Sequence, residues 1–390
     1  MKKFTFILSL LIAITITSNA QWQETELANV IIRSLAVSGS NIFAGTRYSG
    51  VHLSTNNGDS WTAVNSGLTN ANVRSIAISG TNTFLGTQAN GVFLSTNNGD
   101  LWTAINTGLT NNNVTSLAIS GTNIFAGTMG GVFLSTNNGD SWTAVNSGLT
   151  NVKVKSLVIS GTNIFAGTMG GVFLSSNNGN SWTAVNTGLS NHSINTLAIN
   201  GTNVFAGTSG DGIFLSYNNG SYWSAIGLSQ QHIASIVTSG TIIVASSVEG
   251  VWLSNNNGNS WINFGNGLPY GYYHVSSLAI SETFIFAGLT EKGVWKRPLS
   301  EIVGIEEITS KNGMAIYPNP AADFFTLKID NDNQADKTLN IYSLKGSLVK
   351  TETPQHNQQE INISKLNAGI YIVEIKSESF SRKQKLVIQR

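Results

Sequence analysis

The sequence predicts an all-β protein, in which a seven-bladed β-propeller of four-stranded repeats, each about 40 residues long, precedes a small C-terminal β-sandwich. Three observations support this prediction. The motif Ser-x-Asn-Asn-Gly-x-x-Trp occurs six times, at spacings of 38 to 41 residues. Short apolar segments rich in Val, Ile, Phe and Thr, bounded by Gly or Asn, surround each copy. Charged residues are sparse up to residue 300 and about four times denser afterwards, which indicates a second domain.

The first twenty residues have the pattern of a secretory signal peptide. Lys2-Lys3 precedes an apolar run over residues 4–16, and Ser18-Asn19-Ala20 supplies the small residues of a cleavage site. The apolar run has 13 residues, whereas a membrane-spanning helix needs about 20. We therefore expect export and a mature chain that begins at Gln21 and has no transmembrane segment.

The composition argues against several classes of function. The chain has no cysteine, so it has no disulfide framework, thiolate metal site or cysteine nucleophile. Only 11% of the residues are charged and the formal net charge is +1. The chain has no basic stripe, and we expect no nucleic-acid partner. The five histidines lack the spacing of metal ligands, and we expect no metal and no cofactor.

Residues 114–151 give the clearest copy of the repeat. Four apolar segments of four to eight residues, separated by Gly or Asn-Gly, predict four strands and no helix. These strands are apolar on both faces, since Val132 and Leu134 point one way and Phe133 the other. A sheet buried on both faces needs a neighbour on each side, and radially stacked blades provide that arrangement.

A seventh repeat begins at Ser276 and ends after Trp295 without the motif and without a fourth strand. Residues 22–25, Trp-Gln-Glu-Thr, align with residues 61–64 of the first repeat. We expect the N-terminal segment to supply the missing strand, so that residues 21–300 close as seven blades with no open edge.

The motif resembles the Asp-box of sialidase-type and BNR-repeat propellers, except that Asn replaces Asp in every copy: Asn56, Asn97, Asn137, Asn177, Asn218 and Asn256. Asn-Gly favours a tight hairpin, and the Ser hydroxyl and Asn amide can bond to the turn backbone. Repeated Asn without carboxylates is a poor calcium site. We therefore expect the motif to be structural. The repeats also resemble assembly-factor propellers of photosynthetic membranes, which implies a scaffold role.

Function on a propeller is expected where the copies differ. The candidate ligand-binding residues lie on the face opposite the motif turns: Arg33, Arg47, Tyr48, Arg74, Lys155, Tyr270, Tyr272, Tyr273 and His274. The cationic members that begin inner strands would ring the channel mouth and favour an anion, or would be ordinary solvated charges. The tyrosines would stack on sugar rings, or would cover the irregular closure of the ring. Our hypothesis is a patch that binds an extracellular glycan or protein.

A glycoside hydrolase is the alternative function, because the Asp-box resemblance includes sialidases and other hydrolases. Such enzymes need two carboxylates about 5–10 Å apart. Three aspartates lie in the motif turns on the opposite face, which leaves Asp211, Glu249 and Glu291 as candidate catalytic residues. None of these three lies in a recognisable motif, and the Arg-Ile-Pro signature of sialidases is absent. A binding module is therefore preferred over an enzyme.

Residues 301–313 are expected to form a linker, and residues 314–390 a second domain. Three stretches resemble the C-terminal sorting domain of the type IX secretion system of Bacteroidetes: Ile-Tyr-Pro-Asn-Pro-Ala at 316–321, Leu-Asn-Ile-Tyr-Ser-Leu-Lys-Gly at 339–346 and Leu-Asn-Ala-Gly-Ile-Tyr-Ile-Val at 366–373. This resemblance implies the secretion machinery as a partner, export across the outer membrane, and then release or attachment at the surface. An ordinary adhesive β-domain is the alternative.

Overall fold

The computed structural model describes residues 21–69, 71–269, 274–303, 314–317, 319, 321–329, 337–343, 347–377 and 381–388. The chain divides into two compact units, residues 1–299 and residues 300–390. The expected signal peptide and residues 304–313 of the expected linker lie outside the described residues. Residues 301–303 belong to the helix α1 (Ser300–Val303). Among the described residues, no helix has the length and apolar character needed to cross a bilayer.

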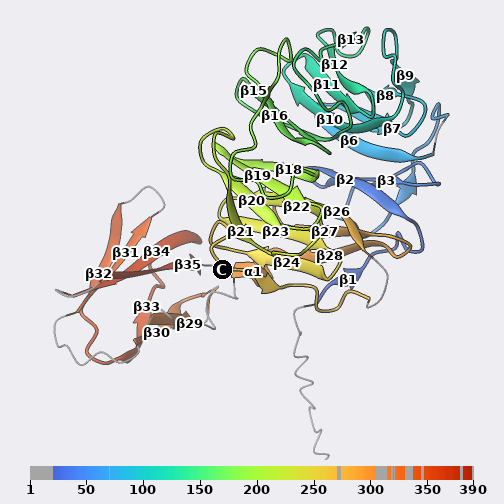
Figure 1. Cartoon of the computed structure of the whole chain (residues 1–390). Coiled ribbons are helices and arrows are strands. Elements are labelled where there is room, and N and C mark those ends of the chain that lie inside the picture. Colours follow the sequence, from blue (N-terminus) through green and yellow to red (C-terminus); the bar gives the residue numbers. More distant parts are fainter. Residues whose placement is uncertain are drawn as a thin grey trace, which may run out of the picture. The chain divides into compact units, whose positions relative to one another are not determined.

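The described part of the first unit forms seven four-stranded antiparallel sheets, which we call blades 1 to 7 in chain order (Figure 1). The first strands are β2 (Ile32–Ser38), β6 (Val73–Ser79), β10 (Val114–Ser120), β14 (Val154–Ser160), β18 (Ile194–Asn200), β22 (Ile233–Ser239) and β26 (Val275–Ile280). The second strands are β3 (Asn41–Thr46), β7 (Asn82–Thr87), β11 (Asn123–Thr128), β15 (Asn163–Thr168), β19 (Asn203–Thr208), β23 (Ile242–Ser247) and β27 (Phe284–Leu289).

The outer half of each blade consists of its third and fourth strands. The third strands are β4 (Val51–Ser54), β8 (Val92–Ser95), β12 (Gly131–Ser135), β16 (Gly171–Ser175), β20 (Ile213–Ser216), β24 (Gly250–Ser254) and β28 (Gly293–Pro298). The fourth strands are β5 (Thr62–Ala63), β9 (Thr103–Ala104), β13 (Thr143–Ala144), β17 (Thr183–Ala184), β21 (Ser224–Gly227), β25 (Ile262–Asn263) and, in blade 7, β1 (Gln23–Glu24).

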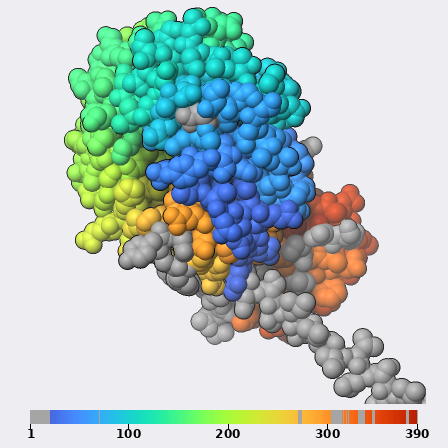
Figure 2. Space-filling model, turned by 90° about the vertical axis from the view of Figure 1, so that its right-hand side faces the viewer, coloured from blue at the N-terminus to red at the C-terminus, as the bar shows by residue number. Residues whose placement is uncertain are grey.

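The blades close into a ring. Each first strand contacts the first strand of the next blade, and β2 contacts β26, so the first strands surround the centre. In Figure 2 the blue start of the chain lies against orange residues that precede residue 300. Val132 and Phe133, on opposite faces of β12, are both buried. The predicted all-β, seven-bladed propeller is confirmed, and its core lies between the blades.

The motif forms a hydrogen-bonded turn between the third and fourth strands. Ser135 Oγ donates to Asn137 Oδ1 and accepts from Gly139 N, each at 2.8 Å. Asn137 Oδ1 also accepts from Ser141 N at 3.1 Å. Asn138 and Gly139 both have left-handed backbones, with φ of 56° and 96°, which is the conformation that an Asn-Gly turn favours. Asn therefore fills the acceptor role of the Asp-box aspartate, while the Asp-box relationship itself stays a prediction.

The motif tryptophan ties blades 2 to 6 each to the preceding blade. Trp142 Nε1 donates to Ile105 O at 2.7 Å. Blade 7 lacks the motif, and Trp22 occupies the equivalent place. Its side chain is 3% exposed, its Nε1 donates to Phe264 O at 2.7 Å, and its ring meets the Phe264 ring edge-on. β1 then pairs antiparallel with β28, so the N-terminal segment completes the last blade.

The two ends of the ring differ. One end, the motif face, carries the motif turns and the hairpins between first and second strands, which are linked by the 3.2 Å bond from Asn57 N to Ser40 O. The other end, the variable face, carries the loops between second and third strands and the connections between blades. Ser190 Oγ donates to Asp211 Oδ2 at 2.5 Å and so links a connection to a loop on this face.

Every blade has a β-bulge near the variable face. The pairing of first and second strands slips by one residue between the first and third residues of the first strand. A bulge leaves one residue unpaired and re-aims its side chain. The seven bulge residues form what we call the bulge ring: Arg33, Arg74, Thr115, Lys155, Asn195, Ala234 and Ser276.

The described part of the second unit forms two sheets. The first contains β29 (Met314–Tyr317), β30 (Phe324–Ile329) and β33 (Gln358–Asn362). The second contains β32 (Leu348–Glu352), β31 (Thr338–Ser343), β34 (Gly369–Lys376) and β35 (Ser381–Ile388). One apolar core, which includes Phe325 and Leu327 from the first sheet and Ile341 and Val373 from the second, joins them. The predicted C-terminal β-sandwich is therefore confirmed.

Candidate functional site

Basic residues of the propeller gather on the variable face. Residues 21–300 contain eight Lys and Arg residues. Six of them belong to the bulge ring, to loops between second and third strands or to blade connections: Arg33, Arg47, Arg74, Lys153, Lys155 and Lys292. Of the nine acidic residues in this range, four lie in the loops or connections of that face: Glu26, Asp211, Glu249 and Glu291. The charge of a weakly charged propeller is thus concentrated at one end.

Three members of the bulge ring tie neighbouring blades together. Their side chains donate to the first carbonyl of the next blade's first strand: Thr115 to Val154 at 2.7 Å, Asn195 to Ile233 at 3.2 Å and Ser276 to Ile32 at 2.6 Å. The described residues give Arg33, Arg74 and Lys155 no such bond. The three cations therefore stand where other copies carry residues with a structural role.

Arg33, Arg47 and Arg74 lie close enough to affect one another. Burial lowers the pKa of the Arg33 guanidinium, and the positive charges of Arg47 and Arg74 lower it further. Burial and Arg47 likewise lower the pKa of Arg74. Arg33 Nε is buried without a hydrogen-bond partner among the described residues. The Arg47 guanidinium carbon lies 5.0 Å from the ring centre of Tyr48, which is 67% exposed. This arginine cluster suits an anion, which would relieve the repulsion.

Arg74 and Lys155 are oriented by amide side chains. Arg74 Nη1 donates to Asn113 Oδ1 at 3.1 Å, and Lys155 Nζ donates to Asn195 Oδ1 at 2.8 Å. Burial lowers the pKa of Lys155. Since amide oxygens carry no charge, both side chains keep their full positive charge for a ligand.

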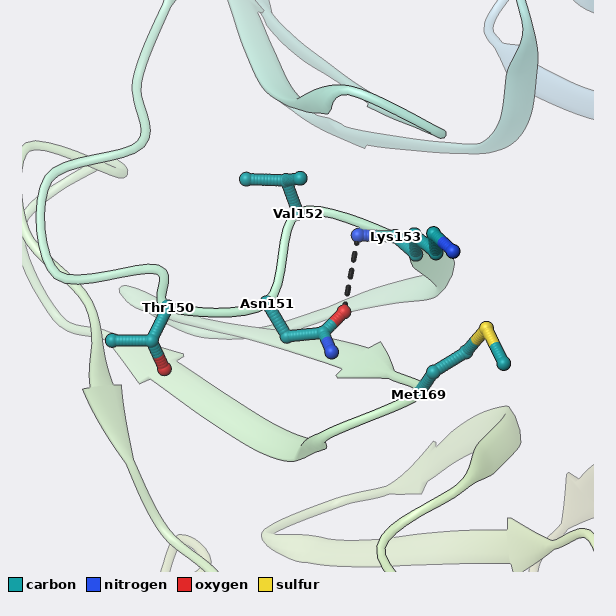
Figure 3. Close-up of a pocket in the computed structure, with 5 residues that line it drawn as sticks. All are labelled: Thr150, Asn151, Val152, Lys153 and Met169. Carbon is teal, nitrogen blue, oxygen red and sulfur yellow. Dashed lines mark hydrogen bonds between the residues drawn. The ribbon is translucent and has the colours of Figure 1, made fainter.

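A hollow of about 310 Å³ lies between the connection into blade 4 and the loop after β15 (Figure 3). One of its lining residues, Lys153, stands two positions before Lys155. The side chains of Lys153 and Met169 extend toward the same side of it, with the Asn151 amide between them. Asn151 Oδ1 accepts a hydrogen bond from Lys153 N at 3.1 Å, which holds the connection in shape.

The three candidate carboxylates lie on three different blades. Asp211 follows β19, Glu249 follows β23 and Glu291 follows β27. The Asp211 carboxylate accepts a hydrogen bond from the Ser190 hydroxyl. Glu249 N donates to Ser247 Oγ at 3.1 Å, and Glu291 has a left-handed backbone with φ of 71°. Their catalytic role stays a prediction, because the arrangement singles out no pair of them.

The tyrosine loop into blade 7 is described only at its end. Tyr270, Tyr272 and Tyr273 lie outside the described residues. His274 is exposed, and its carbonyl accepts bonds from Thr290 N and Thr290 Oγ1, each at 3.0 Å. The proposed stacking of these tyrosines on sugar therefore stays a prediction.

Two charged or titratable residues of this face were missed in the sequence analysis. Lys153 and His232 each stand immediately before a first strand, next to the bulge ring. His232 Nε2 lies 3.2 Å from Asn195 Nδ2. The residue immediately before the first strand differs between copies, and it is Asn113 in blade 3. A comparison of the copies at this position would have identified Lys153 and His232.

Residues 315–389 match the family described as the secretion system C-terminal sorting domain. The sorting domain expected from the sequence is confirmed, and the chain carries the signal for export by the type IX secretion system to the cell surface or the medium.

Three solved structures share the fold. YCF48 from Cyanidioschyzon merolae is 15% identical, with 72% of this chain and 99% of that one covered at a TM-score of 0.58. PorZ, a surface component of the type IX secretion system of Porphyromonas gingivalis, is 15% identical. The match covers 92% of this chain and 59% of PorZ, at a TM-score of 0.57. The GH74 xyloglucanase of Xanthomonas campestris is 14% identical. The match covers 79% of this chain and 59% of the xyloglucanase, at a TM-score of 0.59. Identities this low show the fold alone.

One curated relative shares part of the sequence. The endo-acting ulvan lyase of Formosa agariphila is 27% identical over 100 residues, which are 25% of this chain and 19% of the lyase. The chain thus matches less than one fifth of that relative's length.

Proposed function

We propose that this secreted or surface protein is a binding module whose arginine cluster and bulge ring recognise anionic groups on an extracellular glycan. The observation that carries the proposal is the presence of three cations in the bulge ring, where the other copies have uncharged residues. Arg33, Arg74 and Lys155 stand where three other copies carry uncharged side chains that donate to the backbone of the next blade. Three half-buried cations at one end of a weakly charged propeller are readily explained by an anionic ligand.

The chemistry of the cluster fits a sulfate or carboxylate group on a sugar. Guanidinium groups bind planar or tetrahedral oxyanions through paired hydrogen bonds. An exposed aromatic ring such as Tyr48 offers a flat surface for the apolar face of a sugar. Arg33 Nε is buried and unpaired among the described residues, so a rearrangement of this side chain toward an anion would break no hydrogen bond at that atom.

Retention on immobilised polysaccharides tests the proposal. The panel contains sulfated, uronate-bearing and neutral polymers and includes ulvan, and the protein is the mature chain, residues 21–390. The variant Arg33→Thr with Arg74→Thr introduces the residue that blade 3 carries at the same position, Thr115. We expect anionic polymers to be retained, and the variant to bind about tenfold or more weakly, since each bond to a charged group contributes roughly 1.5–3 kcal/mol.

The control variant is Lys365→Thr, which removes one exposed charge from the second unit. Equal retention of the wild type and the double variant would contradict the proposal. Retention of surface proteins but of no polysaccharide would favour the scaffold alternative. Release of new reducing ends would favour the glycoside hydrolase alternative and direct attention to Asp211, Glu249 and Glu291.

A further inference from the structure

Blade 5 departs from the other blades around a groove on its outer side. This rim groove has a volume of about 530 Å³, and its lining includes Ser190, Asp211, Phe214, Tyr222, Trp223 and Gln230. Ligand sites commonly have volumes of about 300–1,000 Å³. None of the bulge-ring residues contributes to the lining, so the rim groove is distinct from the arginine cluster.

The rim groove coincides with a shortened connection. Ile233 follows Trp223 by ten positions, whereas Ile194 follows Trp182 by twelve. The fourth strand of blade 5, β21, has four residues, whereas β17 of blade 4 has two. The chain after β21 therefore turns back earlier than in blades 1 to 4, and the connection from blade 7 to blade 1, from Trp22 to Ile32, is equally short.

The backbone of this connection is strained. Leu228 and Gln230 have left-handed backbones, with φ of 53° and 66°. Side-chain-bearing residues other than Asn and Asp seldom adopt this conformation, and a leucine does so only when its surroundings require it. The turn also presses against the loop after β19, because a Cβ at Gly212 would lie 2.3 Å from Leu228 O. Among the connections that the structure describes in full, this is the one with left-handed residues other than Gly and Asn, and such strain points to function.

The side chains of the rim groove have the chemistry of a sugar site. Tyr222 stands where four other copies have serine, and its ring is 55% exposed. Its backbone N donates to Asn218 Oδ1 at 3.0 Å, so the motif turn fixes its position. Asp211 uses one carboxylate oxygen for Ser190 and keeps acceptor capacity for sugar hydroxyls. The Gln230 side chain adds an amide that can both donate and accept.

The charge of the rim groove selects against an anion. Among its described lining residues there is no lysine or arginine, and Asp211 is acidic. We infer that the rim groove of blade 5 is a second binding site, which takes a neutral oligosaccharide. The sugar ring stacks on Tyr222, and its hydroxyl groups donate to Asp211 and exchange bonds with Gln230.

Titration of the mature chain with neutral oligosaccharides tests the inference. The probes are gluco-, xylo- and manno-oligosaccharides, followed by calorimetry and by protein NMR. Tyr222→Ser introduces the residue of blades 1, 3, 4 and 6, namely Ser60, Ser141, Ser181 and Ser260. We expect saturable binding of at least one probe, and a loss of about tenfold in Tyr222→Ser, the effect of removing one stacking contact.

The matched control is Tyr217→Thr. Tyr217 lies on the same motif turn, is 64% exposed and is not part of the groove lining, and blades 1 to 3 carry Thr at its position. Tyr217→Thr is expected to bind as tightly as the wild type. The inference is overturned if no neutral probe binds saturably, or if both tyrosine variants lose binding equally. Arg33→Thr with Arg74→Thr should leave neutral binding unchanged, which separates this site from the one proposed above.

Discussion

At the scale of single residues, His52 is a side chain of blade 1 whose polar group is left unsatisfied. It occupies the second position of β4, where blades 2 to 5 have Phe93, Phe133, Phe173 and Phe214. Its Nδ1 is buried without a hydrogen-bond partner among the described residues, and burial lowers the pKa of the imidazole. The Nε1 of Trp61 in the same blade is also unpaired there. Blade 1 thus carries two unsatisfied ring nitrogens.

We expect His52→Phe to stabilise the propeller, most strongly at acid pH. Because the folded pKa of His52 lies below the unfolded value of about 6.5, the unfolded chain binds more protons between the two values. Stability should therefore fall as the pH falls from about 6.5 through the folded pKa, and the phenylalanine variant should lose less. Denaturant unfolding between pH 5 and 8 measures the effect, with the exposed His192→Asn as control. If the wild type and His52→Phe lost equal stability at acid pH, this account would be contradicted.

At the scale of elements, the motif turn is a folding device in which Asn acts through its acceptor oxygen. Asn137→Ala should destabilise blade 3 by about 1–2 kcal/mol, since it leaves Ser135 Oγ and Ser141 N without their acceptor. Asn137→Asp should cost less, because the carboxylate keeps both bonds. The midpoints of chemical unfolding compare the two variants with the wild type. Equal losses would show that the amide NH₂, which donates to Ser141 Oγ, is the important group.

The strand β1 is the element on which ring closure depends. Trp22→Ala should destabilise the propeller by about 3–5 kcal/mol, since it empties a buried indole site and removes the bond to Phe264 O. It should also leave the edge of β28 open to pairing with other chains. Thermal unfolding and light scattering measure both effects. Gln23→Ala, at an exposed position of β1, is the control. A Trp22→Ala protein as stable as the wild type would show that three strands suffice in blade 7.

The elements were predictable from the sequence because each repeats its own signals. Gly, Asn-Gly and Trp recur at fixed places in six copies, so a single physical interpretation applies to all of them. The cations Arg33 and Arg74 were predictable as differences between copies. The bulge that re-aims them and the mutual proximity of the arginines depend on three-dimensional register. The rim groove was not predictable, because it results from the left-handed backbone of Leu228 and Gln230, which no residue type at those positions indicates.

At the scale of the whole molecule, the recognition that we propose and the export signal belong to different units. The propeller carries the arginine cluster and the rim groove, whereas residues 315–389 match the sorting domain. The sorting domain has its own apolar core across two sheets, with Phe325, Leu339 and Val373 fully buried. A unit with its own core can be removed without uncovering the core of the other. Deletion of residues 314–390 should therefore leave a folded propeller.

That truncated propeller should fail to reach the cell surface and should accumulate in the periplasm, because the sorting domain is the part that the secretion machinery is expected to read. Cell fractionation and surface labelling of the full-length and truncated chains, expressed with residues 1–20, measure the outcome. The full-length Arg33→Thr with Arg74→Thr variant is the control, since it changes only the proposed ligand site and should be exported normally. Periplasmic truncated protein that still binds anionic glycan in extracts would separate export from recognition. Normal surface display of the truncated chain would contradict the assignment of export to residues 314–390.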